Sequence, residues 1–330
     1  MSSDLTLSQL FVYPVKGCRG IALASGVVCP TGLLFDRNWV VVRASNGKFV
    51  TQRQKPTLAL VEVSIVPDRL LQGADLAACP DAKLVLRAPG MPELQVPLTA
   101  SAAADKLAPV TVWDWSGQAA DEGDAAAEWF SKYLGLPCRL LRYAGQAGAA
   151  GMPADDPTGT RRQVDTEWAP AGAETAFADG FPFLLANEAS LAEVNQHLAS
   201  KGEAALPINR FRPNLVVRGA GAFAEDGWGS LRIGAAGGAP GDGVEFDNVK
   251  PCSRCKVTTI NQETAEEGME PLVTLGETRS GRVLGWEGTP GFKGAVFFAA
   301  NLVPRQRGLV RVGDAVAVTA TREGPPTPLS

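Results

Sequence analysis

Two cysteines three residues apart, in the string KPCSRCKVTTI, are the residues of this sequence best suited to chemistry. Cys252 and Cys255 could form a disulfide, contribute half of a zinc site, act as a redox dithiol or supply one thiolate ligand to a metal. A structural zinc site needs a second Cys/His pair at ligand spacing, and an iron–sulfur cluster needs further cysteines nearby. The sole histidine is His197 and the other cysteines are scattered along the chain, so the sequence argues against both.

A thioredoxin-like dithiol would stand at the start of a helix that follows a strand. Cys255 leads instead into residues 256–260, a run rich in β-branched residues that predicts a strand. Two interpretations stay open from these residues alone. The pair is either two small packed thiols at the entrance of a strand or part of a functional site.

Cationic residues beside apolar strand ends and turns are the second chemical feature. A guanidinium group binds phosphate through two parallel hydrogen bonds, so arginines in such places suit an anion pocket. Each arginine taken singly fits a solvated surface position better. The set consists of Lys16, Arg19, Arg37, Arg53, Arg212 and Arg254.

The composition excludes several classes of protein. The net charge of −4 and the pI near 5.3 argue against nucleic-acid binding. The first residues lack a basic region followed by an apolar one, and no apolar run approaches the length of a membrane span, so we expect a cytoplasmic protein that does not bind membranes. His197 falls within a predicted helix, which disfavours a Ser–His–Asp hydrolase.

Short strands predominate in the expected secondary structure. Runs of β-branched and aromatic residues predict strands at 10–15, 39–43, 58–66, 83–87, 110–115, 183–186, 214–218, 244–246, 256–260, 294–300 and 309–318. Helices are expected at 124–134 and from Ser190, where Glu193 completes a capping box, and Asn46-Gly47 predicts a hairpin turn. This balance predicts an α+β, mostly β fold with barrel-like sheets and a few helices.

Nine strings, taken in order, resemble MOSC-domain proteins, and most closely the YcbX-like bacterial proteins and the mitochondrial amidoxime-reducing component. They are YPVKGCRG, GLLFDRNWVVV, FVTQRQKP, FADGFPFLLANEASL, FRPNLVV, FAEDGWGSLRIG, KPCSRCKVTTI, EPLVTL and LVRVGDAVAV. The resemblance covers nearly the whole chain. It implies an N-terminal MOSC β-barrel domain at 4–143 and a C-terminal MOSC β-barrel domain at 181–320, which carries the metal-ligand cysteine. The Gly/Ala/Pro-rich stretch 144–180 is expected to be a linker or loop.

This resemblance implies a molybdenum-cofactor oxidoreductase that reduces N-hydroxylated compounds such as amidoximes, hydroxylamines and N-hydroxylated bases. The cofactor would be Mo-molybdopterin, and Cys255 would be both the metal ligand and the catalytic residue, with Cys252 a neighbour. Soft sulfur ligands suit such a metal. The cofactor-binding residues that the resemblance implies are Lys16, Gly17, Arg37, Gly180, Phe181, Arg212, Asn214, Ser253 and Arg254.

The sequence also departs from the family pattern. Gly17 stands where a serine often follows the lysine, Gly180-Phe181 replaces a Thr-Ser pair, and residues 298–301 replace the string FGQN. No cysteine follows Cys255, so we expect the C-terminal ferredoxin domain of many YcbX-like proteins to be missing. Electrons are then expected from a separate donor, namely a ferredoxin-, flavodoxin- or cytochrome-like protein or a flavin reductase.

Three alternative functions remain at this point. The chain could carry the cofactor without turnover, reduce sulfoxides or nitrite at the same metal, or be a β-barrel binding module with structural cysteines. Arg254 and Lys256 flank Cys255 directly, so we expect positive charge to favour its thiolate form. Cys252 follows Pro251 with no such pair of cations adjacent, and we expect it to be a packed thiol.

Overall fold

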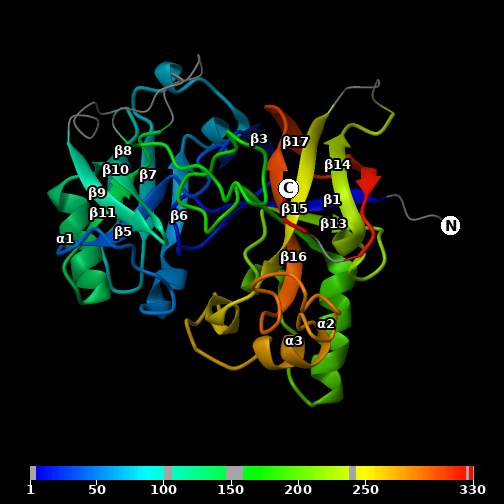
Figure 1. Cartoon of the computed structure of the whole chain (residues 1–330). Coiled ribbons are helices and arrows are strands. Elements are labelled where there is room, and N and C mark those ends of the chain that lie inside the picture. Colours follow the sequence, from blue (N-terminus) through cyan, green and yellow to red (C-terminus); the bar gives the residue numbers. More distant parts are fainter. Residues whose placement is uncertain (1–4, 100–105, 146–158, 238–242, 325–326, 330) are drawn as a thin grey trace.

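The computed structural model describes residues 5–99, 106–145, 159–237, 243–324 and 327–329. Its largest sheet has eight strands in the order β13-β12-β16-β15-β14-β18-β1-β2. An additional pairing of β13 with β1 closes seven of these strands into a barrel, seen on the right of Figure 1. The eight strands are β1 (Thr6–Val12), β2 (Ile21–Leu23), β12 (Phe183–Asn187), β13 (Leu215–Arg218), β14 (Trp228–Gly234), β15 (Val244–Ser253), β16 (Phe297–Pro304) and β18 (Ala315–Thr321).

The first strand of the chain completes this barrel, although the other six strands of the ring come from residue 183 onward. β1 runs antiparallel to β13, with Thr6 opposite Arg218 and Leu10 opposite Leu215. Leu7 and Leu10 are buried in the barrel core. The N-terminal segment and the C-terminal part therefore share one hydrophobic core, and burial of apolar surface on both sides holds them together.

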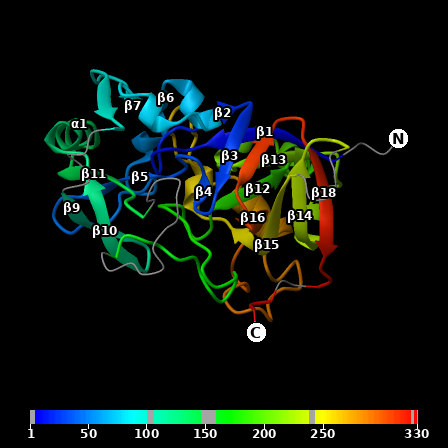
Figure 2. The same cartoon turned by 90° about the horizontal axis from the view of Figure 1, so that it is seen from above.

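Three smaller sheets lie beside the barrel, as Figures 1 and 2 show. Their orders are β5-β11-β10-β9, β6-β7-β8 and β17-β3-β4. The strands are β3 (Ser25–Cys29), β4 (Gly32–Leu33), β5 (Trp39–Arg43), β6 (Glu62–Val66), β7 (Lys83–Arg87), β8 (Leu94–Pro97), β9 (Leu107–Val112), β10 (Trp115–Asp121), β11 (Cys138–Arg142) and β17 (Gly308–Arg311).

Several predicted elements are confirmed. β5, β7 and the helix α1 (Asp124–Leu134) have the predicted bounds, and α1 ends at Gly135, whose φ of 64° is the left-handed conformation that glycine favours at a helix end. The turn at Asn46-Gly47 is also present, with Gly47 at a φ of 67°. With strands predominating and three α-helices among the described residues, the α+β, mostly β fold is confirmed.

Other predicted strands are wrong in part. Residues 256–260 do not form a strand, because Lys256–Thr259 is a 3₁₀ helix in which the Thr258 hydroxyl bonds to the Cys255 carbonyl at 3.0 Å. Such local side-chain bonds compete with strand pairing. The expected strand 309–318 is two strands, β17 and β18, separated by a turn. Residues 58–66 begin in a 3₁₀ helix before β6, and 110–115 span the loop between β9 and β10.

The predicted capping box of the second helix is wrong as well. The helix α2 (Glu188–Ser200) is capped by Asn187, whose side chain accepts a hydrogen bond from the backbone two residues on at 3.0 Å. Ser190 is fully buried; its hydroxyl donates to Glu225 Oε1 at 2.7 Å and accepts from the Phe223 N–H at 2.8 Å. The Ser190 hydroxyl therefore bonds to Glu225, a residue distant in sequence, instead of capping the helix as the local pattern predicted.

Residues 146–158 of the expected linker lie outside the described residues. Of the remainder, residues 159–180 are irregular backbone that packs closely on the neighbouring sheet. Phe177 is fully buried in a cluster with Val40 and Tyr143, and Trp168 stacks on Phe292 with ring centres 5.5 Å apart. The domain bounds 4–143 and 181–320 stay predictions.

None of the helices within the described ranges has the length and apolarity needed to cross a bilayer. The third helix, α3 (Leu272–Thr278), lies beside α2 below the barrel in Figure 1. His197 is partly exposed on α2 and lies 3.5 Å from Glu193, a surface pair. This agrees with the expected place of His197 on the surface of a helix.

The buried carboxyl of Glu225 provides a test of this core. Glu225 accepts hydrogen bonds from Ser190 and from Asn187 Nδ2 at 3.0 Å, and burial raises the pKa of its carboxyl. Glu225→Ala leaves both donors buried without this acceptor, so we expect it to lower the free energy of unfolding by about 2–4 kcal/mol. Glu225→Gln keeps a carbonyl acceptor and should cost less than half of that, as measured by urea denaturation. Equal losses in the two variants would contradict this role.

Candidate functional site

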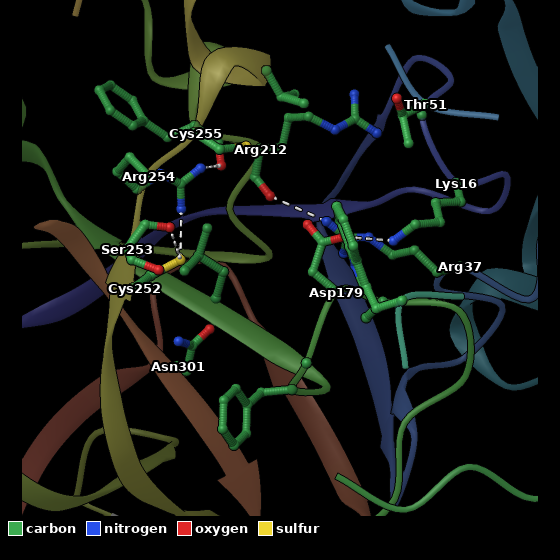
Figure 3. Close-up of a pocket in the computed structure, with 18 of the residues that line it drawn as sticks. Lys16, Arg37, Thr51, Asp179, Arg212, Cys252, Ser253, Arg254, Cys255 and Asn301 are labelled. Atoms are coloured by element: carbon green, nitrogen blue, oxygen red, sulfur yellow. Dashed lines mark hydrogen bonds and ion pairs between the residues drawn. The ribbon is translucent and has the colours of Figure 1, made fainter. Parts of the chain in front are cut away.

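One cavity of about 360 Å³ is lined both by the N-terminal part of the chain and by the strands and loops of the barrel. All ten residues predicted for the site line it. Figure 3 shows several of them approaching the cavity from different elements. The ten are Lys16, Gly17, Arg37, Gly180, Phe181, Arg212, Asn214, Ser253, Arg254 and Cys255. Their individual roles remain predictions.

Lys16 provides the first cation of the cavity. It follows β1 after a short turn, is 9 % exposed, and donates from Nζ to Asp179 Oδ1 at 2.6 Å. Burial lowers the pKa of Lys16 to about 8, although Asp179 opposes this change. The cavity therefore carries this positive charge at neutral pH and loses it as the pH rises through about 8.

Arg37 and Arg212 form a second cationic group around one aromatic ring. Their guanidinium carbons lie 4.3 and 4.4 Å from the ring centre of Tyr13, a cation–π geometry. Beside them lies Asp36, a carboxylate that is 1 % exposed and 2.5 Å from Arg37 Nη1. Burial raises the pKa of the Tyr13 hydroxyl to about 12, so Tyr13 stays neutral and serves as a platform for both arginines.

Asn214 joins this group to the barrel. Its side-chain oxygen accepts from Arg37 Nη1 at 3.0 Å and from the Leu184 N–H at 3.3 Å, and its Nδ2 donates to the Phe11 carbonyl at 3.2 Å. Asn214 is only 1 % exposed. Its clearest action in the structure is therefore to fix the guanidinium of Arg37 at the cavity wall.

Gln52 and Gln262 make a buried amide pair behind the arginines. Each donates from Nε2 to the other's Oε1 at 3.0 Å, and Gln52 also donates to the Gly17 carbonyl at 2.6 Å. Gln262 Oε1 accepts from Arg212 Nη1 at 3.0 Å. Gly17 has a φ of 84°, so glycine at this position fits the left-handed turn that brings its carbonyl to Gln52.

The two cysteines stand at the end of β15 and just beyond it. The structure corrects the expected distribution of charge: Arg254 Nη1 donates to the sulfur of Cys252 at 2.8 Å, and its Nη2 donates to the Phe211 carbonyl at 2.9 Å (Figure 3). Lys256 pairs with Glu267. The expectation assumed that residues adjacent to Cys255 in sequence also lie beside its sulfur. In extended backbone adjacent side chains point in different directions, so Arg254 and Lys256 contact other partners.

Partial burial raises the pKa of the Cys252 thiol, and Arg254 opposes that change. All six cysteines are free thiols, which removes the disulfide interpretation of the pair. Cys252 and Cys255 both line the cavity, so two sulfur atoms are available to a ligand there.

The segment before β12 supplies residues that sequence reasoning missed. Asp179 has a side chain that is 77 % exposed, and its Oδ1 also accepts from Trp113 Nε1 at 3.1 Å. Arg162, which is 5 % exposed, holds this segment by donating to the carbonyls of Ala176 at 3.1 Å, of Asp179 at 2.6 Å, and of Ala178. Asp179 could have been found from its place in FADGFPF beside Gly180, whereas no local signal marked Arg162 or Trp113.

The side chains around the cavity suit an anionic ligand that also carries a soft metal. Among the described residues that line it, six are cationic (Lys16, Arg37, Arg53, Arg212, Lys250 and Arg254), against the single carboxylate of Asp179. The described part of the chain has no group of three or more His, Cys, Asp or Glu side chains that could hold a metal ion. The excess of cations fits a phosphate, and the thiols fit a metal that prefers sulfur.

Comparisons with known proteins agree with this architecture. The description "MOSC N-terminal beta barrel domain" matches residues 4–137, and "MOSC domain" matches residues 173–317. The chain is 32% identical over 317 residues to the mitochondrial amidoxime reducing component 2 of Bos taurus, covering 94% of this chain and 82% of that protein. It is 30% identical over 321 residues to the mitochondrial amidoxime-reducing component 1 of Homo sapiens, covering 94% and 82%.

A molybdenum cofactor sulfurase of Danio rerio is also similar, at 30% identity over 292 residues, which covers 85% of this chain and 31% of that larger protein. These matches extend over both parts of the chain that line the cavity. The chain therefore belongs to the MOSC-domain family that includes the mitochondrial amidoxime-reducing components.

Proposed function

We propose that this protein is a molybdenum-cofactor oxidoreductase that reduces N-hydroxylated compounds such as amidoximes, hydroxylamines and N-hydroxylated bases. One observation supports this most strongly: the cations, the two thiols and Asp179 converge on one cavity in a chain whose relatives are named for amidoxime reduction. The reduction consumes two electrons and two protons and converts N–OH to N–H and water.

In this proposal the cationic walls hold the anionic cofactor, Mo-molybdopterin. Lys16, Arg37 and Arg212 would bind its phosphate, and Cys255 would be its thiolate ligand from the protein. When bound, the molybdenum centre would supply the two-electron redox chemistry and accept the oxygen atom. The protein supplies ligation, orientation and a partly enclosed cavity.

Asp179 is suited to orient the substrate. Its Oδ1 accepts hydrogen bonds from both Lys16 and Trp113, whereas its Oδ2 has no hydrogen-bond partner among the described residues. Oδ2 could therefore accept a hydrogen bond from a substrate N–H or N–OH group. Lys16 donates to Oδ1 at 2.6 Å and so helps to hold the carboxylate in place.

A second candidate is a carrier that binds the cofactor without turnover. The similarity to part of a molybdenum cofactor sulfurase favours it, because that relative is named for an action on the cofactor itself. The two functions differ in one measurement: a carrier contains pterin and molybdenum but yields no amidine from an amidoxime under any reductant.

We further propose that electrons arrive from a separate protein in the cytoplasm. The cysteines of this sequence lack the spacing that an iron–sulfur cluster needs. Purified holoprotein with NADH alone should therefore leave benzamidoxime unchanged. Chemically reduced methyl viologen should restore turnover, as followed by chromatography of benzamidine. Turnover with NADH and no mediator would contradict the need for a separate donor.

The two cysteines should respond differently to substitution. Cys255→Ala removes the proposed ligand, so it should abolish amidoxime reduction while the bound pterin, held by other residues, largely remains. Cys252→Ala removes a thiol that Arg254 already contacts, and should keep substantial activity and an unchanged molybdenum spectrum. Reduction is assayed with reduced methyl viologen, and pterin by fluorescence after oxidation. An active Cys255→Ala together with an inactive Cys252→Ala would reverse the assignment.

Arg212 should be needed to retain the cofactor. Removing one charged hydrogen-bond partner of a buried anion costs about 2–5 kcal/mol of binding free energy. Arg212→Ala should therefore purify with little pterin. Arg218→Ala, at the exposed end of β13, is the matched control and should keep a full complement. Circular dichroism and thermal unfolding check that both variants are folded. Full occupancy in Arg212→Ala would show that this arginine serves only the protein structure.

A further inference from the structure

The loop between β9 and β10 places a bulky residue in a conformation that favours glycine. Val112 pairs with Trp115, so the loop consists of Trp113 and Asp114 alone. Trp113 has a φ of 54°, in the left-handed region that is strained for a large side chain. Trp113 is 40% exposed and lines the cavity. A strained and exposed tryptophan in a cavity wall points to a role other than packing.

Neighbouring side chains hold this indole in one orientation. Phe49 contacts it in a T-shaped arrangement, with ring centres 4.9 Å apart. Its Nε1 donates to Asp179 Oδ1 at 3.1 Å, and Asp179 is itself fixed by Lys16. The ring is therefore part of the same hydrogen-bonded group as the carboxylate that is suited to orient the substrate.

A guanidinium group already lies on this ring. The guanidinium carbon of Arg53 is 4.9 Å from the ring centre of Trp113. Arg53 is exposed, and this contact with the ring is the one interaction of its side chain found within the described residues. A guanidinium is a planar cation with nitrogens on one carbon, which is also the shape of an amidine. The ring thus binds, from its own chain, a group that closely resembles the product of amidoxime reduction.

We propose that Trp113 determines substrate specificity by stacking on the planar N–C–N group of an amidoxime or amidine, and that Arg53 occupies the same place until the ligand displaces it. This rests on the proposed function of reducing N-hydroxylated compounds. Cation–π attraction acts on both a flat conjugated cation and a tetrahedral ammonium, whereas stacking on the ring favours the flat cation. Trp113 acts with Asp179: the ring selects the planar group and the carboxylate accepts its N–H.

Calorimetric binding of two probes to the cofactor-containing protein tests this without turnover. Benzamidine carries the planar cation, and benzylamine carries a tetrahedral one on the same phenyl ring. Trp113→Gly, which suits the loop backbone, should weaken benzamidine binding about 3- to 10-fold and weaken benzylamine binding less. Trp113→Phe should keep most of the benzamidine affinity. Trp115→Phe, on the same hairpin with its indole bonded to the Arg161 carbonyl at 3.1 Å, is the matched control.

Arg53→Gln provides an independent test, because it is expected to strengthen benzamidine binding instead of weakening it. Loss of the competing guanidinium should tighten benzamidine binding about 2- to 5-fold. Removing the positive charge of Arg53 should strengthen the binding of both cationic probes equally. Freeing the ring of Trp113 should strengthen benzamidine binding further, so we expect a larger gain in affinity for benzamidine than for benzylamine. Equal gains for both probes would overturn the competition between Arg53 and the ligand.

Three further results would overturn the role of Trp113. They are no measurable benzamidine binding to the unmodified protein, unchanged benzamidine affinity in Trp113→Gly, and loss of bound pterin from Trp113→Gly, which would make the indole a wall of the cofactor site. Benzamidoxime turnover by the unmodified protein is measured separately. Turnover with unchanged affinities refutes only the stacking role, whereas the expected affinities without turnover refute only the reductase function.

Discussion

Among the described residues, six lysine and arginine side chains share the wall of one cavity with a single carboxylate. Like charges repel more strongly in such a partly buried space than in water. The fold reduces this repulsion locally. Asp36 lies buried against Arg37, and the Tyr13 ring lies under both Arg37 and Arg212. Backbone carbonyls accept hydrogen bonds from other guanidinium nitrogens; Arg212 Nη2, for example, donates to the Cys18 carbonyl at 2.7 Å. The positive charge that remains is what an anionic cofactor would neutralise, so cofactor binding and the stability of this region are expected to be linked.

The same interactions make the two parts of the chain depend on each other. Arg37 and Gln52, from the N-terminal part, bond to Asn214 and Gln262 of the C-terminal part at 3.0 Å. β1 adds the strand that closes the barrel. The cations of the cavity come from both parts of the chain and meet only in the folded protein.

Within that cavity the chemistry is divided between a sulfur side and a carboxylate side. Cys252 stands at the end of β15 and Cys255 just beyond it, and Arg254 donates to the sulfur of Cys252. Asp179 stands on the segment that Arg162 anchors, with Lys16 and Trp113 as its partners. In the proposed function the first side holds the metal and the second orients the substrate. The aromatic wall at Trp113 would then decide which N-hydroxylated groups reach the metal.

The sequence by itself determined the elements whose local preference agrees with their surroundings, such as β5, β7 and the helix Asp124–Leu134 with its glycine stop. It also identified which residue types would meet in the cavity, through the resemblance to MOSC-domain proteins. Only the tertiary structure decided how they meet. Lys16 and Asp179 are 163 positions apart, and Arg254 donates to the Phe211 carbonyl 43 positions away. Contacts between distant residues leave no local pattern, because their free energy arises only after the chain has closed the intervening loop.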